Sequence, residues 1–358
     1  MKHARSNTYN DDNSREHYKI DKSNSKKKQS TTLVKSDSLD TVYFGEIKIG
    51  NQKFDILFDT GSSNLFVSDK NCISASCFNH NKFDPNKSPT FKKEGNPWSI
   101  VFGTGFASGI TGIDDVTLAG FTAKKQIFGL ATNVSDFFVP LVADGILGLA
   151  FDSLNTLDNG SPTFISTLIN QKKINPLFSF HLPRAANFED QGTLTLGGVE
   201  RDKFKGDITF SHVQKTPVNG TDKFGFWIIN LEDASVNKKS LSTKRKAIMD
   251  TGTSNIIIPN DDAAKLHSQI PGAKIDPSGS GLFIIPCNTK AVVSLKFGGK
   301  NFEINPIDLV MPVSENLCAS AIMPGFAPGY WLVGITFLKN VYSVFDVKTP
   351  SVGLANNR

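Results

Sequence analysis

One short sequence occurs twice in this 358-residue chain, and each copy centres on an aspartate. The first copy runs from Phe58 to Asn64 and the second from Met249 to Asn255; both contain Asp-Thr-Gly. Apolar runs precede and follow each copy, which predicts a tight turn between two buried strands. Burying an ionised carboxylate without partners costs several kcal/mol, so each aspartate is hydrogen-bonded for structure or held for chemistry.

Two copies of the motif indicate a pair of carboxylates. If the halves of the chain are similar units related by a pseudo-twofold axis, Asp59 and Asp250 can face each other across that axis. Carboxylates roughly 3 Å apart cannot both ionise, so they would share one proton, and one would act as base while the other acts as acid. A water between them would be activated for attack on a carbonyl carbon, with no metal and no cofactor required.

The residues next to each aspartate fit this arrangement. Threonines can hydrogen-bond across the axis, glycines let backbone N–H groups approach the carboxylates, and hydroxyls can orient them. These supporting residues are Thr60, Gly61, Ser62, Thr251, Gly252 and Thr253.

A second repeated element follows each aspartate. It reads Ile146-Leu147-Gly148 in the first half and Leu332-Val333-Gly334 in the second, so the repeat extends over whole lobes. With these motifs and with Gly103-Thr104-Gly105, the chain resembles the pepsin-like aspartic endopeptidases of the two-domain type, over about residues 39–356. The competing interpretation is a β-protein with two incidental Asp-Thr-Gly turns.

The resemblance implies an all-β, bilobal fold with two pseudo-twofold-related β-barrel-like lobes and a few short helices. The composition agrees, because runs rich in β-branched and aromatic residues, such as Tyr43–Ile49, Gly192–Leu196 and Val341–Phe345, favour strands. One helix is predicted to begin at Ser161-Pro162 and another at Asn260. We expect an N-terminal lobe over 39–205 and a C-terminal lobe over 206–358.

Residues 1–38 differ in composition from the rest. The first 40 residues carry nine Lys/Arg and six Asp/Glu, a net +3 of the chain's +5, with few apolar side chains. Such a segment cannot build a core, which predicts a flexible basic tail. The alternative is the remnant of an inhibitory pro-segment of a zymogen, in which Tyr18-Lys19 resembles the contact made with the dyad. The globular remainder carries only +2, which does not suggest nucleic acid.

Four cysteines formally allow three disulfide pairings. The family pairs them as they fall, Cys72 with Cys77 and Cys287 with Cys318. A zinc site is the competing interpretation, but Cys-x-x-Cys and His-Glu-x-x-His motifs are absent from the sequence. Paired cysteines indicate an oxidising compartment, so we expect a secreted or lumenal protein. In that setting the sequons at Asn133 and Asn219 are candidate glycosylation sites.

The predicted flap, the hairpin that closes over substrate, comprises Phe102, Gly103, Thr104 and Gly105. The family usually has Tyr at position 102, hydrogen-bonded to a Trp at position 66, whereas this chain has Phe102 and Phe66. Replacing both partners of a buried hydrogen bond by apolar groups can be nearly neutral. The double change therefore indicates a repacked flap, the alternative being two unrelated phenylalanines in a chain that has 28 of them.

Residues that resemble the substrate pockets are mostly large and apolar, which predicts cleavage between large hydrophobic residues. Ala143 stands where the family often has a larger residue, which would widen the pocket for the residue before the scissile bond, S1. The candidate pocket residues are Leu57, Phe66, Phe137, Ala143, Ile146, Phe226, Ile248 and Leu332.

Ile335 follows Gly334 where the family often has Asp. An apolar residue there makes the surroundings of the second turn drier, and a drier site raises the pKa of a carboxyl group. We therefore expect a pH optimum less acidic than that of stomach pepsin.

The sequence thus predicts an acid-acting aspartic endopeptidase with Asp59 and Asp250 as its dyad. We expect an extended peptide or unfolded protein as substrate, sensitivity to pepstatin-type inhibitors, a monomer, and no membrane or nucleic-acid partner. The longest apolar stretches are too short to span a bilayer, and the absence of a hydrophobic leader favours a processed or expressed form. The alternatives are a catalytically inactive pepsin-like protein that binds peptides and, more distantly, a serine or cysteine hydrolase.

Overall fold

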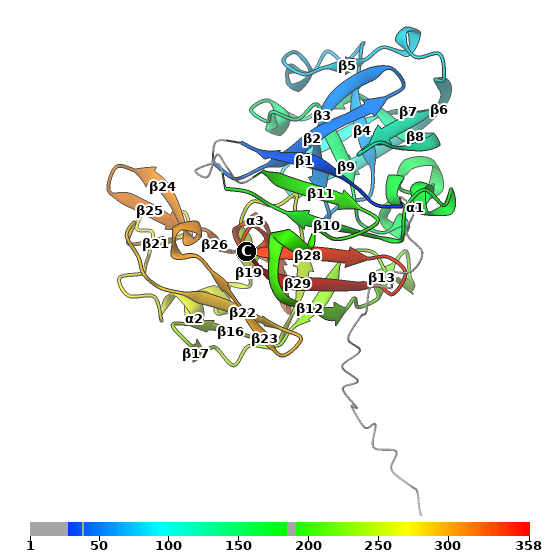
Figure 1. Cartoon of the computed structure of the whole chain (residues 1–358). Coiled ribbons are helices and arrows are strands. Elements are labelled where there is room, and N and C mark those ends of the chain that lie inside the picture. The colour runs from blue at the N-terminus through cyan, green and yellow to red at the C-terminus, as the bar shows by residue number, and fades with distance from the viewer. Residues whose placement is uncertain (1–27, 38, 185–190) are drawn as a thin grey trace, which may run out of the picture.

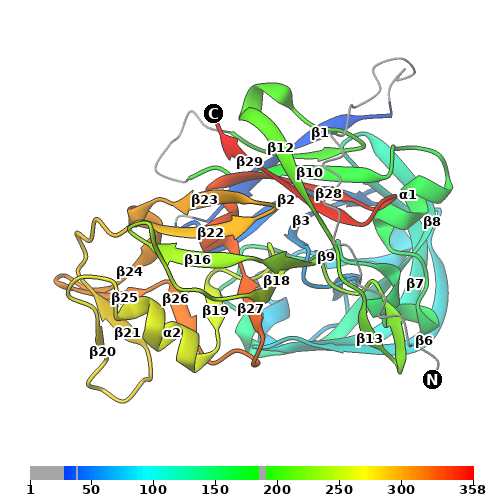
Figure 2. The same ribbon diagram turned by 90° about the horizontal axis from the view of Figure 1, so that it is seen from below.

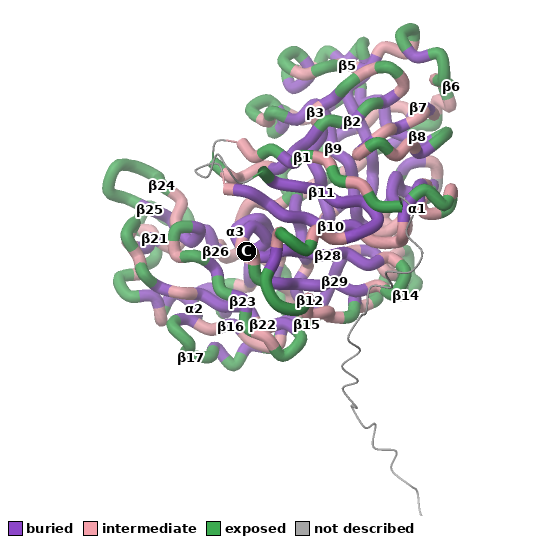
Figure 3. Tube along the Cα trace, in the orientation of Figure 1, coloured by how far each residue is buried: buried purple, intermediate pink, exposed green. Residues whose placement is uncertain are grey.

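A computed structural model describes residues 28–37, 39–184 and 191–358. It is built mostly of strands, as predicted, with short helices α1 (Phe164–Asn170), α2 (Asn260–His267) and α3 (Ile335–Leu338). Two lobes lie on either side of a shared sheet (Figure 1). The buried positions run continuously through this sheet into both lobes (Figure 3). Single 3₁₀ turns are η1 (Ala75–Cys77), η2 (Pro85–Lys87), η3 (Asp136–Phe138), η4 (Asp152–Leu154), η5 (Leu157–Asn159), η6 (Arg201–Lys203) and η7 (Pro306–Leu309).

The N-terminal lobe is a closed barrel. Its strands are hydrogen-bonded in the order β2-β3-β9-β4-β8-β7, and pairing of β2 with β7 closes the ring. Closure leaves these strands without exposed edges. The strands of this lobe are β2 (Tyr43–Ile49), β3 (Gln52–Asp59), β4 (Leu65–Asp69), β5 (Lys82–Phe83), β6 (Lys92–Val101), β7 (Phe106–Leu118), β8 (Phe121–Val134) and β9 (Gly145–Gly148).

The sheet between the lobes takes strands from both halves of the chain, in the order β12-β29-β28-β10-β11-β1. Figure 2 shows it lying across the two lobes. A small apolar cluster on this sheet contains Phe204 and Tyr342. Its strands are β1 (Ser30–Ser36), β10 (Leu177–His181), β11 (Gly192–Leu196), β12 (Phe204–His212), β28 (Val341–Asp346) and β29 (Ser351–Asn357).

The C-terminal lobe consists of several smaller sheets. One has the order β15-β18-β27-β19-β26, and two others are β17-β16-β22-β23 and β20-β21-β25-β24. The hairpin of β13 (Thr216–Val218) and β14 (Thr221–Lys223) precedes them. The strands of this lobe are β15 (Ile228–Leu231), β16 (Asp233–Val236), β17 (Lys239–Ser240), β18 (Arg245–Met249), β19 (Ile256–Ile258), β20 (Lys274–Ile275), β21 (Phe283–Ile285), β22 (Val293–Phe297), β23 (Lys300–Ile304), β24 (Val310–Ser314), β25 (Leu317–Ser320), β26 (Ile322–Pro324) and β27 (Tyr330–Val333).

The same four-strand arrangement occurs in both lobes. In the first, β3 runs parallel to β9, β9 antiparallel to β4, and β4 parallel to β8. In the second, β18 runs parallel to β27, β27 antiparallel to β19, and β19 parallel to β26. The repeated motifs of the sequence therefore correspond to a repeated topology.

The strands β1 and β12 bear on the predicted boundaries of the tail and of the lobes. Residues 30–36 are not part of a tail, because β1 pairs with β11 over Ser30–Val34 and with β2 over Lys35–Ser36. A strand that lies between two neighbours is stabilised by backbone hydrogen bonds to both of them. The polar side chains of β1 therefore gave no indication in the sequence that it is a strand. The boundary at 205/206 falls inside β12, one strand of the shared sheet. Residues 1–27, including Tyr18 and Lys19, lie outside the described part of the chain.

The two expected helices are present with one shift in position. The helix α2 begins at Asn260, as predicted. The helix α1 begins at Phe164 and not at Ser161-Pro162, because Thr163 is its N-cap and accepts a hydrogen bond from the Ser166 amide. The four-residue α3, which begins directly after Gly334, was not predicted.

Candidate active site

The two Asp-Thr-Gly turns connect β3 to β4 and β18 to β19, and they are hydrogen-bonded to each other. The Thr60 amide donates to Thr251 Oγ1 at 3.0 Å, and the Thr251 amide donates to Thr60 Oγ1 at 2.9 Å. Each hydroxyl then donates across the axis to a strand carbonyl, Thr60 to Met249 and Thr251 to Phe58. This reciprocal set fixes one turn against the other.

Each carboxylate is oriented by its own turn in the same way. The Gly61 amide donates to Asp59 Oδ1 at 2.7 Å, and the Gly252 amide donates to Asp250 Oδ1 at 2.8 Å. The second oxygen of each carboxylate accepts from a hydroxyl, that of Ser62 for Asp59 and that of Thr253 for Asp250. Equivalent donors therefore hold both side chains.

The two carboxylates lie close together and are largely shielded from solvent. Asp59 is 5% exposed and Asp250 is 8% exposed. A Cβ on Gly252 would lie 2.3 Å from Asp59 Oδ1 and 3.2 Å from Asp250 Oδ1, so both groups adjoin the same glycine. Burial raises the pKa of Asp59 above its ordinary value, and the negative charge of Asp250 raises it further. The pair therefore retains a proton at pH values where an exposed aspartate has lost it.

The glycine of each second repeated element secures its turn. The Gly148 amide donates to the Asn64 carbonyl at 2.9 Å, and the Gly334 amide donates to the Asn255 carbonyl at 3.1 Å. A Cβ on Gly148 would lie 2.5 Å from backbone atoms of Ser63. Only glycine permits this close approach of two chain segments.

Further residues that the sequence analysis missed connect the turns to their surroundings. Ser254 Oγ donates to the Thr41 carbonyl at 2.7 Å, and Ser63 Oγ donates to the Phe151 carbonyl at 2.7 Å. These serines occupy equivalent positions in the two copies of the motif, so the repeat itself was the signal that could have identified them. Trp227 Nε1 donates to the Leu149 carbonyl at 2.9 Å and so joins the second half of the chain to the first.

The predicted flap lies at the tip of the hairpin formed by β6 and β7. The Phe102 amide donates to the Gly105 carbonyl at 2.7 Å, and Gly103 and Thr104 are exposed at the tip. The Phe102 ring packs against Phe66, with centroids 6.3 Å apart, and against Phe138 at 5.9 Å. Trp98, which the sequence analysis did not single out, packs on Phe66 at 5.5 Å and donates to the Ile110 carbonyl.

These contacts predict the effect of restoring the usual family pair. Phe102→Tyr alone should not raise kcat/KM, because its hydroxyl would enter an aromatic cluster without a defined partner, at a cost of about 1–3 kcal/mol. Phe102→Tyr combined with Phe66→Trp supplies a donor and an acceptor together, so we expect kcat/KM above that of either single variant. A double-mutant cycle measures this coupling. A gain from Phe102→Tyr alone would refute it.

The predicted pocket residues fall into two groups. Leu57, Phe66, Ala143 and Ile146 are buried in one apolar cluster beneath the flap, and Phe66 lies fully inside this cluster. Phe137 is 44% exposed beside Phe138. In the other lobe, Ile248 and Leu332 are adjacent across β18 and β27 and half-buried, as is Phe226.

Ile335 is buried at the first turn of α3, and its amide donates to the Thr253 carbonyl at 2.8 Å. The hydroxyl of Thr253 in turn donates to Asp250, so position 335 adjoins the second turn. We expect Ile335→Asp to move the acidic limb of the rate profile to lower pH, because it replaces an apolar side chain beside the second turn by one that can form hydrogen bonds, which makes the surroundings of the dyad less dry. The measurement is kcat/KM against pH, with Ile335→Val as control. An acidic limb that does not move would count against this role.

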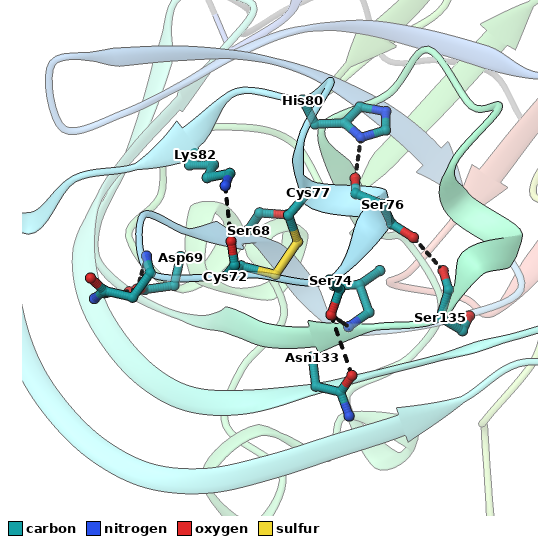
Figure 4. The surroundings of a disulfide bond; sticks show 12 residues. Ser68, Asp69, Cys72, Ser74, Ser76, Cys77, His80, Lys82, Asn133 and Ser135 are labelled. Carbon is teal, nitrogen blue, oxygen red and sulfur yellow. Dashed lines mark hydrogen bonds between the residues drawn. A yellow bond between two sulfur atoms is a disulfide. The ribbon is translucent and has the colours of Figure 1, made fainter.

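Both cysteine pairs are bonded as the family resemblance implied. Cys72 is joined to Cys77, with Cα atoms 6.0 Å apart, and Cys287 to Cys318, with Cα atoms 5.2 Å apart. Figure 4 shows the first disulfide and its polar surroundings in the N-terminal lobe. Within the described residues, no helix is long and apolar enough to cross a membrane.

Comparison with known proteins identifies similar chains over most of this length. The sequence model of the family described as "Eukaryotic aspartyl protease" matches residues 42–357. An Arthroderma benhamiae protein named "Probable aspartic-type endopeptidase CTSD" is 37% identical over 333 residues, covering 91% of this chain and 63% of its own length. Rhizopuspepsin-1 of Rhizopus niveus is 36% identical, covering 88% and 79%, and cathepsin E-B of Xenopus laevis is 34% identical, covering 88% and 80%.

Proposed function

Because the chain belongs to the eukaryotic aspartyl protease family, we propose that it is an aspartic endopeptidase whose dyad is Asp59 and Asp250. The observation that carries this proposal is the reciprocal hydrogen bonding of Thr60 and Thr251, which sets two equivalently oriented carboxylates side by side. Each carboxylate also keeps its glycine amide and its hydroxyl donor. The inactive, peptide-binding alternative has no such observation in its favour.

The chemistry follows from the shared proton. With one proton on the pair, the ionised carboxylate accepts a proton from a water molecule, whose oxygen attacks the carbonyl carbon of the peptide bond. The protonated carboxyl donates to the carbonyl oxygen as negative charge develops there. The tetrahedral intermediate then collapses, the C–N bond breaks, and the leaving nitrogen takes a proton from the dyad. Full ionisation removes the acid and full protonation removes the base, so activity requires the intermediate state.

The substrate is an extended peptide with large apolar residues on both sides of the cleaved bond. Support comes from the apolar cluster beneath the flap, with Phe137 exposed beside it, and from the adjacent half-buried Ile248 and Leu332 across β18 and β27. Burial of a large apolar side chain in such a pocket contributes about 1.5–3 kcal/mol. The backbone of the substrate can be held by main-chain hydrogen bonds to the flap.

The test is hydrolysis of denatured casein between pH 2 and 7, with and without pepstatin, on the full chain before and after acid incubation. A pepstatin-sensitive, bell-shaped profile supports the dyad. N-terminal sequencing after incubation reports whether residues preceding β1 are removed as a pro-segment. Lack of hydrolysis at every pH would leave a peptide-binding protein.

An oxidising compartment is proposed as the site of action. Its support is the two disulfides, since such bonds persist in secreted and lumenal proteins. Asn133 and Asn219 are exposed, and Asn219 lies in the turn between β13 and β14, so both side chains are accessible to a glycosyltransferase. Intact mass before and after deglycosylation of secreted material tests this; an unchanged mass would exclude glycans at both sites.

A further inference from the structure

His80 lies between two segments of the N-terminal lobe and contacts a backbone carbonyl with each ring nitrogen. Its Nδ1 is 2.5 Å from the carbonyl oxygen of Ser76, and its Nε2 is 2.7 Å from that of Leu141. Figure 4 shows the ring above Ser76, next to the Cys72–Cys77 disulfide. A neutral imidazole has one N–H and one lone pair, so it can satisfy only one carbonyl. The doubly protonated ring donates to both.

The segment that His80 holds runs from Ser135 to Leu141 and includes η3. At its beginning, Ser76 Oγ donates to the Ser135 carbonyl at 2.6 Å, and the Ser135 amide donates to the Phe106 carbonyl on the flap strand β7. At its end, Leu141 faces His80. The disulfide loop and the residues directly after it therefore hold both ends of the segment, through Ser76 at one end and His80 at the other.

Two phenylalanines lie between these anchors and border the candidate S1 pocket. Phe138 packs edge-on against Phe66, with centroids 6.3 Å apart, and against the flap residue Phe102 at 5.9 Å. Phe137 packs on Phe138 and is partly exposed. A displacement of Leu141 would therefore also move Phe137 and Phe138, which border the pocket and contact the predicted flap.

We propose that doubly protonated His80 is a positioning residue that clamps segment 135–141 under acidic conditions and thereby fixes Phe137 and Phe138 for substrate binding. Its catalytic consequence rests on the proposed function. The clamp acts on substrate affinity, because His80 contacts the segment behind the pocket and not the dyad. Loss of the second proton turns one donor into a lone pair that faces a carbonyl oxygen, which opens one side of the clamp.

Ionisable side chains on the neighbouring elements already have partners or face solvent. Asp144, beyond Leu141, accepts from the amides of Asp55 and Asn81. Lys82 on β5 donates to the Cys72 carbonyl, and Asp136 on η3 is exposed. The two carbonyl groups are thus the contacts that distinguish the charge states of His80.

NMR tests the charge state of the His80 ring directly. Full-length protein carrying Asp59→Asn, which prevents self-digestion, is labelled with ¹⁵N-histidine, and the His80 signals are assigned by their loss in His80→Gln. We expect both ring nitrogens to be protonated at pH 4.5 and one to be deprotonated at pH 8. A neutral His80 ring at pH 4.5 would overturn the proposal. This readout requires no enzymatic activity.

The functional consequence is tested by kinetics on a peptide with Phe before the scissile bond. Glutamine can donate to one carbonyl but does not titrate, so His80→Gln should raise KM about tenfold at pH 4, with kcat little changed. The KM ratio of variant to wild type should fall toward one as pH rises to 6.5. The matched control is His212→Gln, at an exposed histidine on β12, which should leave KM unchanged.

The outcomes separate this proposal from the proposed function. A KM ratio that is the same at pH 4 and pH 6.5 would overturn the clamp even if His80→Gln weakens binding, because a merely structural role has no such pH dependence. If the wild-type chain hydrolyses nothing, the proposed function fails while the NMR result still decides the charge state on which the clamp depends.

Discussion

Asp59→Asn is expected to abolish peptide hydrolysis, with kcat/KM reduced at least about 1,000-fold, because the pair then lacks the proton exchange that general acid–base catalysis requires. Asp250→Asn should have an equal effect, since the two carboxylates are held by equivalent donors. The fold should persist. Asparagine can keep the acceptor toward the Gly61 amide, and the Ser62 hydroxyl can turn to accept from the new amide. The measurement is cleavage of a chromogenic peptide at the pH optimum.

The same substitution is expected to stabilise the protein near neutral pH. The pKa of Asp59 is raised from 3.8 by burial and by Asp250, so the folded chain holds a proton that the unfolded chain releases near pH 4. Above that pH the folded state binds more protons than the unfolded state, and each further unit of pH costs it up to about 1.4 kcal/mol. Asparagine has no proton to lose. The Tm of Asp59→Asn should therefore exceed that of wild type at pH 6–7 and match it at pH 3.

A suitable control for both measurements is Asp222→Asn on β14, because Asp222 is exposed. This variant should retain wild-type activity and a wild-type dependence of Tm on pH. A lower Tm for Asp59→Asn at pH 7 would show that the carboxylate stabilises the fold as an ion, contrary to the repulsion inferred from its burial beside Asp250.

The repeated motif predicted the fold because a pseudo-twofold pair of turns imposes much of the topology around it. The apolar runs on either side of Asp59 and Asp250 became β3, β4, β18 and β19, and the second repeated elements became the strands that pair with them. These strands are buried on both faces, so their sequence is nearly continuous in apolar residues. The apolar runs around both aspartates were therefore a clear sequence signal for buried strands.

The strand β1 and the clamp at His80 were not predicted because their interactions are made by backbone groups. The pairing of β1 with β11 and the contacts of His80 with two carbonyl oxygens leave no pattern of apolar side chains. Sequence periodicity reports which side chains are buried, whereas these features depend on which chain segments the topology brings together. Similarly, the position of Trp98 against Phe66 follows from the pairing of β6 with β7.

Alanine substitutions at the glycines of the Asp-Thr-Gly motifs should reduce catalysis, whereas alanine substitutions at the glycines of the second repeated elements should reduce stability. A Cβ on Gly61 would lie 2.5 Å from the Asp250 carboxylate, and a Cβ on Gly252 would lie 2.3 Å from the Asp59 carboxylate. Each methyl group would displace a side chain of the opposite turn. Because a displacement of about 1 Å can reduce the rate about 100-fold, we expect kcat/KM to fall at least that much in Gly61→Ala and Gly252→Ala while Tm changes little.

Gly148→Ala and Gly334→Ala should instead unfold the protein or lower its stability by several kcal/mol. Their Cβ atoms would lie 2.5 Å from the Ser63 backbone and 2.1 Å from the Thr253 carbonyl oxygen, and neither backbone can move without separating a turn from its supporting strand. Thermal unfolding followed by circular dichroism measures the difference, with Gly103→Ala at the open flap tip as a stability control. Equal destabilisation by alanine at all four positions would mean that Gly61 and Gly252 are also required for folding. In that case the carboxylates could not move aside to accommodate a methyl group.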